Sequence, residues 1–219
     1  MSAFGDAPRW GPLEAKAPRR LVVLLHGLGA DGFDLIDLAP GWARAVPGAV
    51  FVAPHGSEPC DLAPYGRQWF SLSDRTPARV AAGASSAAAR LGPVVMAEAA
   101  ALGLAAGQVA LMGFSQGCMM ALATGLRLTP PMAGILGYAG ALPDSAGLSG
   151  WIAARPPVCL LHGEEDGIVP IAAGRAAAAA LAAAGVEVET HWRPDLDHGL
   201  DEAGISAGAL FLQRVLGGA

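Results

Sequence analysis

The stretch VALMGFSQGCMMAL, Val109–Leu122, places one polar side chain, Ser115, between Gly113 and Gly117 with apolar runs on both sides. The run before the serine is typical of a buried strand, and the run after it is typical of a helix. A Gly-x-Ser-x-Gly segment at such a turn holds the serine hydroxyl out of a tight bend, where bulkier neighbours would collide. The pattern alone arises by chance in a glycine-rich chain, so its place between a strand and a helix carries the prediction that Ser115 is a nucleophile.

Further short apolar runs predict the strands of one sheet. Most are apolar on both faces, which is typical of a parallel sheet covered on both sides. The run at 186–192 alternates and predicts an edge strand with one face in water, on which His191 would lie at the surface. The predicted strands are Leu21–Gly27, Ala49–Pro54, Gln108–Gly113, Ala133–Gly140, Pro157–Gly163 and Val186–Trp192.

Helical segments alternate with these strands. The alternation predicts an α/β fold with a mainly parallel central sheet, helices on both faces and right-handed crossovers. Residues 1–219 are expected to form a single domain, in which residues 1–20 are a surface segment, and Gly92-Pro93 is expected to break or kink one helix. The predicted helices are Leu35–Val46, Val80–Leu104, Gln116–Leu128, Ile171–Ala184 and Asp201–Leu216.

Composition narrows the class of protein. The 219 residues are 53% hydrophobic and 15% charged, which favours a compact fold. The net charge of -5 leaves no basic footprint for nucleic acid. The three cysteines, Cys60, Cys118 and Cys159, form no even-numbered disulfide framework and suggest a reducing compartment. With no signal-peptide pattern and no apolar run approaching the roughly 20 residues of a membrane span, we expect a cytoplasmic protein without stable membrane insertion.

A serine nucleophile needs a base, and the base needs an acid to orient it. Ligands bind at the carboxyl ends of the strands in this architecture, so candidates should follow strands. Asp166 follows the fifth predicted strand and His198 follows the sixth, and the order of serine, aspartate and histidine is that of α/β-hydrolases. Glu164 and Glu165 flank Asp166 and are alternatives for the acid, but the segment DGIVP favours Asp166 at the apex of a loop.

Other acidic and histidine side chains near these strand ends have plainer interpretations. Asp195 and Asp197 are too close in sequence to the histidine to orient it readily and are interpreted as solvated turn residues. His55 also lies at a strand end, whereas His26 and His162 are interpreted as structural, with ring nitrogens bonded to backbone. No histidine has the HExxH spacing, so no metal site is expected.

Acyl transfer also builds negative charge on the substrate oxygen, which two backbone N–H groups usually meet. Gln116, directly after the serine, supplies the first. The second is expected from the loop HGLGADGFD, with Leu28 or Gly29 best placed. This loop lacks the lysine and the acidic residue of nucleotide-binding glycine loops, so no organic cofactor is expected.

The segments HGLGADGFD, RQWFSL, LMGFSQGCMMAL, HGEEDGIVP and DHG, in this order, resemble the small carboxylesterase/phospholipase family of α/β-hydrolases, which includes acyl-protein thioesterases. The resemblance runs from about Leu21 to Leu216. It implies an α/β-hydrolase fold without a large lid, and an open site. This chain differs from the family's usual sequence at Ser71, where family members usually carry an acidic residue, and at Cys118. The roles it implies are Ser115, Asp166 and His198 as nucleophile, acid and base; Leu28 and Gln116 as oxyanion donors; and Trp69, Phe70 and Leu72 as the border of the acyl pocket.

These observations predict a serine carboxylesterase that hydrolyses short- to medium-chain carboxylic esters through an acyl-enzyme. An acyl-protein thioesterase or a lysophospholipase would use the same machinery and is the alternative. A binding module that has kept the fold without the chemistry is a third possibility. The expected partner is a small-molecule ester or acyl-thioester, and the expected assembly is a monomer or homodimer.

Overall fold

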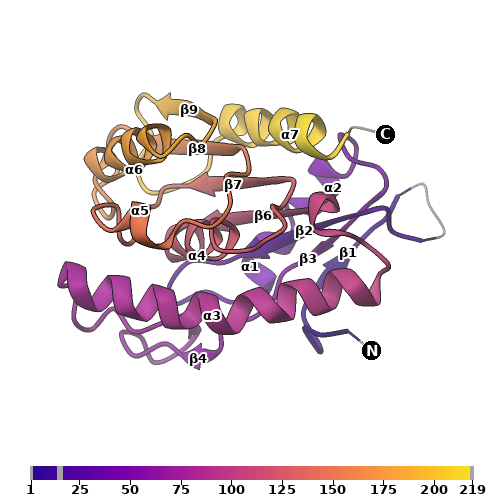
Figure 1. The fold of residues 1–219 in the computed structure, drawn as a ribbon, viewed down its shortest axis with the longest axis horizontal. Coiled ribbons are helices and arrows are strands. Elements are labelled where there is room, and N and C mark those ends of the chain that lie inside the picture. Colours follow the sequence, from indigo (N-terminus) through magenta and orange to yellow (C-terminus); the bar gives the residue numbers. More distant parts are fainter. Residues whose placement is uncertain (1, 14–16, 218–219) are drawn as a thin grey trace.

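The computed structural model describes residues 2–13 and 17–217, which form a central sheet between two layers of helices (Figure 1). Six of its seven strands are parallel, and the strand order is β1-β3-β2-β6-β7-β8-β9. The strands are β1 (Arg9–Trp10), β2 (Arg20–Leu25), β3 (Ala49–Val52), β6 (Val109–Phe114), β7 (Gly134–Tyr138), β8 (Val158–Gly163) and β9 (Val188–Arg193).

The sheet confirms the six predicted strands to within a few residues and adds one. Arg9–Trp10 pairs antiparallel with β3 at the edge of the sheet, so the segment expected to lie at the surface also adds an edge strand, of which Arg9 is exposed and Trp10 half-buried. Arg9 also forms an ion pair with the buried Glu98 carboxylate at 2.8 Å. A two-residue strand is too short to show a periodic pattern, and only its partner strand identifies it.

The helices cover both faces, as expected. Apolar residues of α3, α4 and α6 pack on one face of the sheet, and those of α1, α2 and α7 pack on the other. The helices are α1 (Phe33–Ile36), α2 (Ala39–Trp42), α3 (Pro77–Ala101), α4 (Gln116–Gly125), α5 (Leu148–Trp151), α6 (Ile171–Ala183) and α7 (Glu202–Leu216), with a short 3₁₀ turn at Ala106–Gln108.

Two helix predictions are corrected. The segment predicted as one helix over 35–46 forms the short α1 and α2, since Pro40, in the first turn of α2, lacks the N–H that a continuous helix would need. In contrast, of the break or kink expected at Gly92-Pro93, the break does not occur, because Pro93 lies inside α3, which continues along the molecule (Figure 1). A buried stripe of α3 packs against α4 and outweighs the hydrogen bond lost at Pro93.

Among the described residues, α3 is also the one helix long and apolar enough to cross a membrane by length and composition alone. A core helix of a globular fold meets the same criterion. Eight residues of α3 are buried in this fold, among them Leu91 and Val95.

The edge strand β9 is where it was predicted, but its faces are less distinct than the alternation indicates. Thr190 is exposed, while His191 is half-buried and bonds Glu189 at 2.6 Å under the cover of α7. The opposite face of the strand packs toward α6.

The topology also determines where a site can lie. From β2 the chain moves outward to β3, and it later returns to the other side of β2 as β6, so the strand order reverses between β2 and β6. Ligands of open α/β sheets bind at such a reversal, beyond the carboxyl ends of the strands. The loops after β2 and β6 hold Leu28 and Ser115, and the loop after β3 carries a small second sheet of β4 (Glu58–Pro59) and β5 (Arg67–Gln68).

Candidate active site

Ser115 occupies a strained turn between β6 and α4. Its backbone φ of 55° and ψ of -116° lie outside the regions that residues other than glycine ordinarily adopt. The turn exists because two glycines permit it: a Cβ on Gly113 would lie 2.1 Å from Gly117 O, and one on Gly117 would lie 1.8 Å from Leu25 O. Backbone strain maintained in this way is typical of functional sites. The close approach at Gly113 and Gly117 agrees with the prediction that bulkier residues at these two positions would collide in the turn at Ser115.

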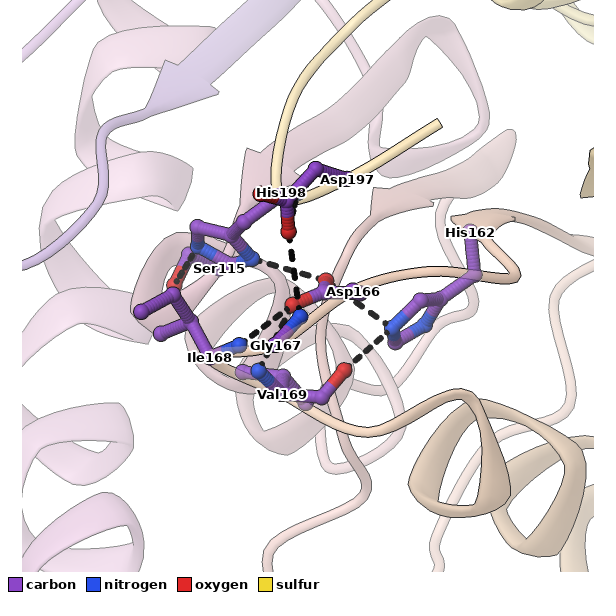
Figure 2. A network of polar contacts seen from close by, with 8 residues as sticks. All are labelled: Ser115, His162, Asp166, Gly167, Ile168, Val169, Asp197 and His198. Carbon is purple, nitrogen blue, oxygen red and sulfur yellow. Dashed lines mark hydrogen bonds and ion pairs between the residues drawn. The ribbon is translucent and has the colours of Figure 1, made fainter. Parts of the chain in front are cut away.

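The structure brings His198 and Asp166 to this serine. His198 Nε2 lies 3.0 Å from Ser115 Oγ, and His198 Nδ1 lies 2.8 Å from Asp166 Oδ2 (Figure 2). Asp166 follows β8, and His198 follows β9, so three carboxyl ends of the sheet contribute to one hydrogen-bonded chain. The imidazole also packs against Phe114, with 4.9 Å between the ring centroids, which restricts its rotation.

The Asp166 carboxylate is surrounded by donors. Its Oδ1 accepts hydrogen bonds from the backbone N–H groups of Ile168 and Val169 at 2.9 and 2.8 Å. Its side chain is fully buried, and burial alone would raise its pKa. The bonds from His198 and from the two backbone groups outweigh burial and hold the pKa of Asp166 below its ordinary value. The carboxylate therefore stays ionised beside the imidazole at neutral pH.

A second histidine supports the same carboxylate. His162 Nε2 lies 2.7 Å from Val169 O and 3.2 Å from Asp166 Oδ2, and its side chain is buried (Figure 2). A Cβ on Gly174 would lie 2.6 Å from His162 Nδ1, so glycine at that position in α6 makes room for the ring. The structural interpretation of His162 is confirmed, and its contact with Asp166 is an addition.

Asp197 is exposed to solvent, as interpreted, but it also accepts two hydrogen bonds that the sequence did not indicate. Its Oδ1 accepts from the backbone N–H of Gly167 at 3.0 Å and from that of His198 at 2.8 Å (Figure 2). It thereby ties the loop that carries His198 to the loop that carries Asp166. Two donors from loops 30 residues apart in sequence leave no local signal, so the bridge could be found only in three dimensions.

Glu164 and Glu165, the alternative candidates for the acid, do not bond the histidine of the site in the described structure. Glu164 pairs with Arg175 at 2.6 Å, and neither Glu164 nor Glu165 bonds a histidine within the part of the chain that the structure describes. Asp195 has a φ of 57°, which fits the predicted turn.

The residues that line the cleft include Leu28 and Gln116, whose backbone N–H groups have no hydrogen-bond partner among the described residues. Neither Leu28 N nor Gln116 N donates to any atom of residues 2–13 or 17–217. The loop of Leu28 is held in place by His26, whose Nδ1–H donates to Gly27 O at 2.7 Å while Nε2 accepts from Gly56 N at 2.8 Å. Burial lowers the pKa of His26 and keeps the ring neutral in this role, which confirms its structural interpretation.

The Gln116 side chain has a function that sequence reasoning missed. Its Oε1 accepts from Trp69 N at 3.0 Å, and its Nε2 donates to Phe70 O at 2.7 Å. Trp69 Nε1 in turn donates to His26 O at 2.9 Å. These bonds join the loop before α3 to the loops after β2 and β6.

A cleft next to Ser115 has a volume of about 390 Å³. Leu72 lines it, whereas Trp69 and Phe70 are buried behind it as supports. This differs from the expectation that all three border the cleft, because the side chains of Trp69 and Phe70 belong to the buried core cluster. The remaining lining is Leu28, Arg75, Val80, Ser115, Gln116, Met119, Ile168, Val169, Pro170 and His198.

One cluster outside this cleft has metal-ligating side chains. The ligand atoms of Cys159, Glu189 and His191 lie within 4.8 Å of one another. Arg214 Nη2 lies 2.7 Å from Glu189 Oε2, and burial raises the pKa of the Cys159 thiol to about 12. A guanidinium and a protonated thiol both oppose a cation, so this cluster is better described as an ion-pair network under α7.

Comparison with known proteins adds to this geometry. The profile of the phospholipase/carboxylesterase family matches residues 13–216. The chain belongs to this family. Esterase YpfH of Escherichia coli is a relative that is 30% identical over 190 residues, which are 85% of this chain and 78% of the relative.

Other members of the phospholipase/carboxylesterase family extend the likeness. Acyl-protein thioesterase 1 of Gibberella zeae is 32% identical over 119 residues, about half of each chain. The crystal structure of esterase PE8 superposes with a TM-score of 0.90 at 35% identity, over 96% of this chain and 98% of that one. The fold is that of an α/β-hydrolase, as predicted, and the family indicates hydrolysis of ester or acyl bonds.

Proposed function

We propose that this protein is a serine carboxylesterase that hydrolyses short- to medium-chain carboxylic esters through an acyl-enzyme. The observation that carries the proposal is the unbroken hydrogen-bonded chain from Ser115 Oγ through the two ring nitrogens of His198 to Asp166 Oδ2. Nucleophile, base and orienting acid stand in the order and at the distances that acyl transfer needs.

In the acylation step, His198 Nε2 takes the proton of Ser115 as Oγ attacks the ester carbonyl carbon. The tetrahedral oxyanion accepts from the N–H groups of Leu28 and Gln116, which have no other described partner. Collapse breaks the ester C–O bond, and His198 gives its proton to the departing alkoxide. Asp166 holds Nδ1–H in place and stabilises the imidazolium between these transfers.

In the deacylation step, water repeats the sequence. His198 removes a proton from water, the hydroxide adds to the acyl carbon, and the same proton returns to Ser115 Oγ as the carboxylic acid leaves. The cleft volume of about 390 Å³ lies near the lower end of small-molecule sites, which span about 300–1,000 Å³. Its apolar wall of Leu72, Val80 and Met119 suits an acyl chain of short to medium length.

The test is the Ser115→Ala variant, assayed with p-nitrophenyl esters of increasing acyl length, a palmitoyl thioester and a lysophospholipid. We expect kcat to fall by about 10⁵–10⁶-fold, while the fold persists, because the nucleophile alone is removed. Peptide mass analysis after treatment with a fluorophosphonate should place the adduct on Ser115. Substantial activity in the alanine variant, or an adduct at another residue, would overturn the proposal. A wild type that prefers the thioester would instead assign it the thioesterase role carried by the name of the Gibberella relative.

A further inference from the structure

The cleft beside Ser115 contains an unexpected charge. Its lining is apolar or neutral apart from His198 and one other side chain, Arg75. Arg75 lies between the end of the loop that contains Leu72 and the start of α3 at Pro77. No carboxylate of the described residues lines the cleft with it.

Within the described part of the chain, the guanidinium of the exposed Arg75 has a single hydrogen-bond partner. Its Nε donates to Leu72 O at 3.4 Å, a long bond, and the two Nη groups donate to no atom of residues 2–13 or 17–217. The neighbouring carboxylate is engaged elsewhere: Asp74 Oδ1 accepts from Thr76 N at 2.9 Å, and its Oδ2 lies 3.8 Å from Arg79 Nε.

A guanidinium on an apolar wall has a specific chemical preference. Its planar fork of N–H donors matches the two oxygens of a carboxylate or the oxygens of a phosphate. A charge held by protein carboxylates would be neutralised, but Arg75 has no ion pair with a described residue, so its donors remain available to a ligand. Substrate in the cleft would displace water around the pair and strengthen it.

We infer that Arg75 selects substrates with an anionic group, a carboxylate or a phosphate carried a few bonds from the ester that Ser115 attacks. This inference rests on the proposed esterase function of the same cleft. The substrate class is thereby esters that bear a second, anionic oxygen group, such as the half-esters of dicarboxylic acids or the acyl esters of phosphorylated alcohols.

The test compares matched pairs of substrates. Monoethyl esters of succinate, glutarate and adipate are each paired with the ester in which a primary amide replaces the carboxylate. In a second arm, butyryl glycerol phosphate is paired with butyryl glycerol. We expect the wild type to show a higher kcat/KM for the charged member in at least one arm, and the arm with the preference identifies which anion the cleft takes. Arg75→Gln should lower kcat/KM for that charged ester about fivefold and change that of its neutral partner less than twofold.

Two variants control for charge and position. Arg75→Lys keeps the charge without the planar fork and should retain part of the preference. Arg79→Gln removes the same charge from the first turns of α3, where Arg79 is highly exposed and lies outside the cleft lining, so it should leave the preference intact. High salt should weaken the wild-type preference, because an exposed cation is screened.

The outcomes separate this inference from the esterase proposal. If the wild type shows no preference for the charged member in either arm, or if Arg75→Gln lowers both members of each pair equally, the anion inference is wrong. Hydrolysis of the neutral esters that Ser115→Ala abolishes would leave the esterase proposal standing in that case. An effect of Arg79→Gln equal to that of Arg75→Gln would also overturn the inference, since it would show long-range attraction rather than contact.

Discussion

Replacing Asp166 by asparagine tests the proposed mechanism most directly. The carboxylate accepts from three donors, the backbone N–H groups of Ile168 and Val169 at Oδ1 and the ring of His198 at Oδ2, and His162 Nε2 lies 3.2 Å from Oδ2. In Asp166→Asn, the amide oxygen can keep both backbone bonds, but the NH₂ group replaces Oδ2 and faces His198 Nδ1, which donates to Oδ2 in the wild type. The substitution therefore removes an acceptor at one place and preserves the loop elsewhere.

The consequence is chemical rather than structural. To pair with the NH₂ group, His198 has to move its proton from Nδ1 to Nε2, where it faces the serine and can no longer act as a base. The same aspartate-to-asparagine change in a serine protease triad lowers kcat by about 10⁴, which corresponds to about 5 kcal/mol of transition-state stabilisation, and we expect a loss of that order here. His162 keeps its bond to Val169 O at 2.7 Å, so we expect little change in the melting temperature.

The assay is kcat on p-nitrophenyl butyrate, with the melting temperature measured on the same samples. Glu164→Gln and Glu165→Gln are matched controls, because each removes one negative charge from the same loop and neither carboxylate bonds a histidine in the described chain. We expect both controls to stay within about twofold of wild type. If Asp166→Asn kept more than a tenth of kcat, or if Glu165→Gln lost as much as Asp166→Asn, the assignment of the acid would be refuted.

Individual contacts elsewhere in the fold give three more predictions. Asp197→Ala should lower kcat on the same ester by about 10-fold or more, because the loop of His198 loses its hydrogen bond to the loop of Asp166. Asp197→Asn keeps an accepting oxygen and should retain most of the wild-type kcat. Equal losses in the two variants would contradict the role of Asp197 in joining the loops. Burial alone would raise the pKa of Glu98, but bonds from Arg9 and the N-terminal segment outweigh burial and hold the pKa below its ordinary value of 4.5. The ionised Glu98 therefore stabilises the fold above that pH, and this stabilisation is lost as the pH falls through the lowered pKa. The free energy of unfolding in urea should depend less on acid pH in Glu98→Gln than in the wild type, and an unchanged dependence would count against this role. Burial raises the pKa of Cys118 and Cys159 to about 12. In the folded protein, iodoacetamide at mildly alkaline pH should therefore alkylate only the half-exposed Cys60, which peptide mass analysis would detect. Alkylation of Cys118 or Cys159 without unfolding would contradict the structure.

Local patterns account for most of what could be predicted. The strands were found because a doubly covered parallel strand is apolar along its whole length, and Val109–Phe114 differs by one residue at each end from its prediction. The turn at Ser115 was found because only glycine tolerates the close contacts on either side. Asp166 and His198 were found because each follows a strand, and parallel strands end at the same edge of a sheet.

Other features lay beyond local patterns. The strand Arg9–Trp10 exists only because β3 pairs with it, and α3 continues through Pro93 only because its buried face packs on the fold. The family resemblance implied that Trp69 and Phe70 border the cleft, but both side chains are buried in the core, and hydrogen bonds with Gln116 hold their backbone. Hydrogen bonds between distant loops have no periodic signature in the chain.

By itself, therefore, the amino-acid sequence determined the parallel sheet, the serine turn and the identities of the three side chains proposed for catalysis, because hydrophobic period, glycine sterics and chain order act over a few neighbouring residues. Only the tertiary structure decided how those side chains are held. The tie through Asp197, the support of Asp166 by His162 and the single unpaired cation of the cleft, within the described residues, arise where loops from different strands meet. Contacts of this kind depend on three-dimensional proximity, which no short stretch of sequence encodes.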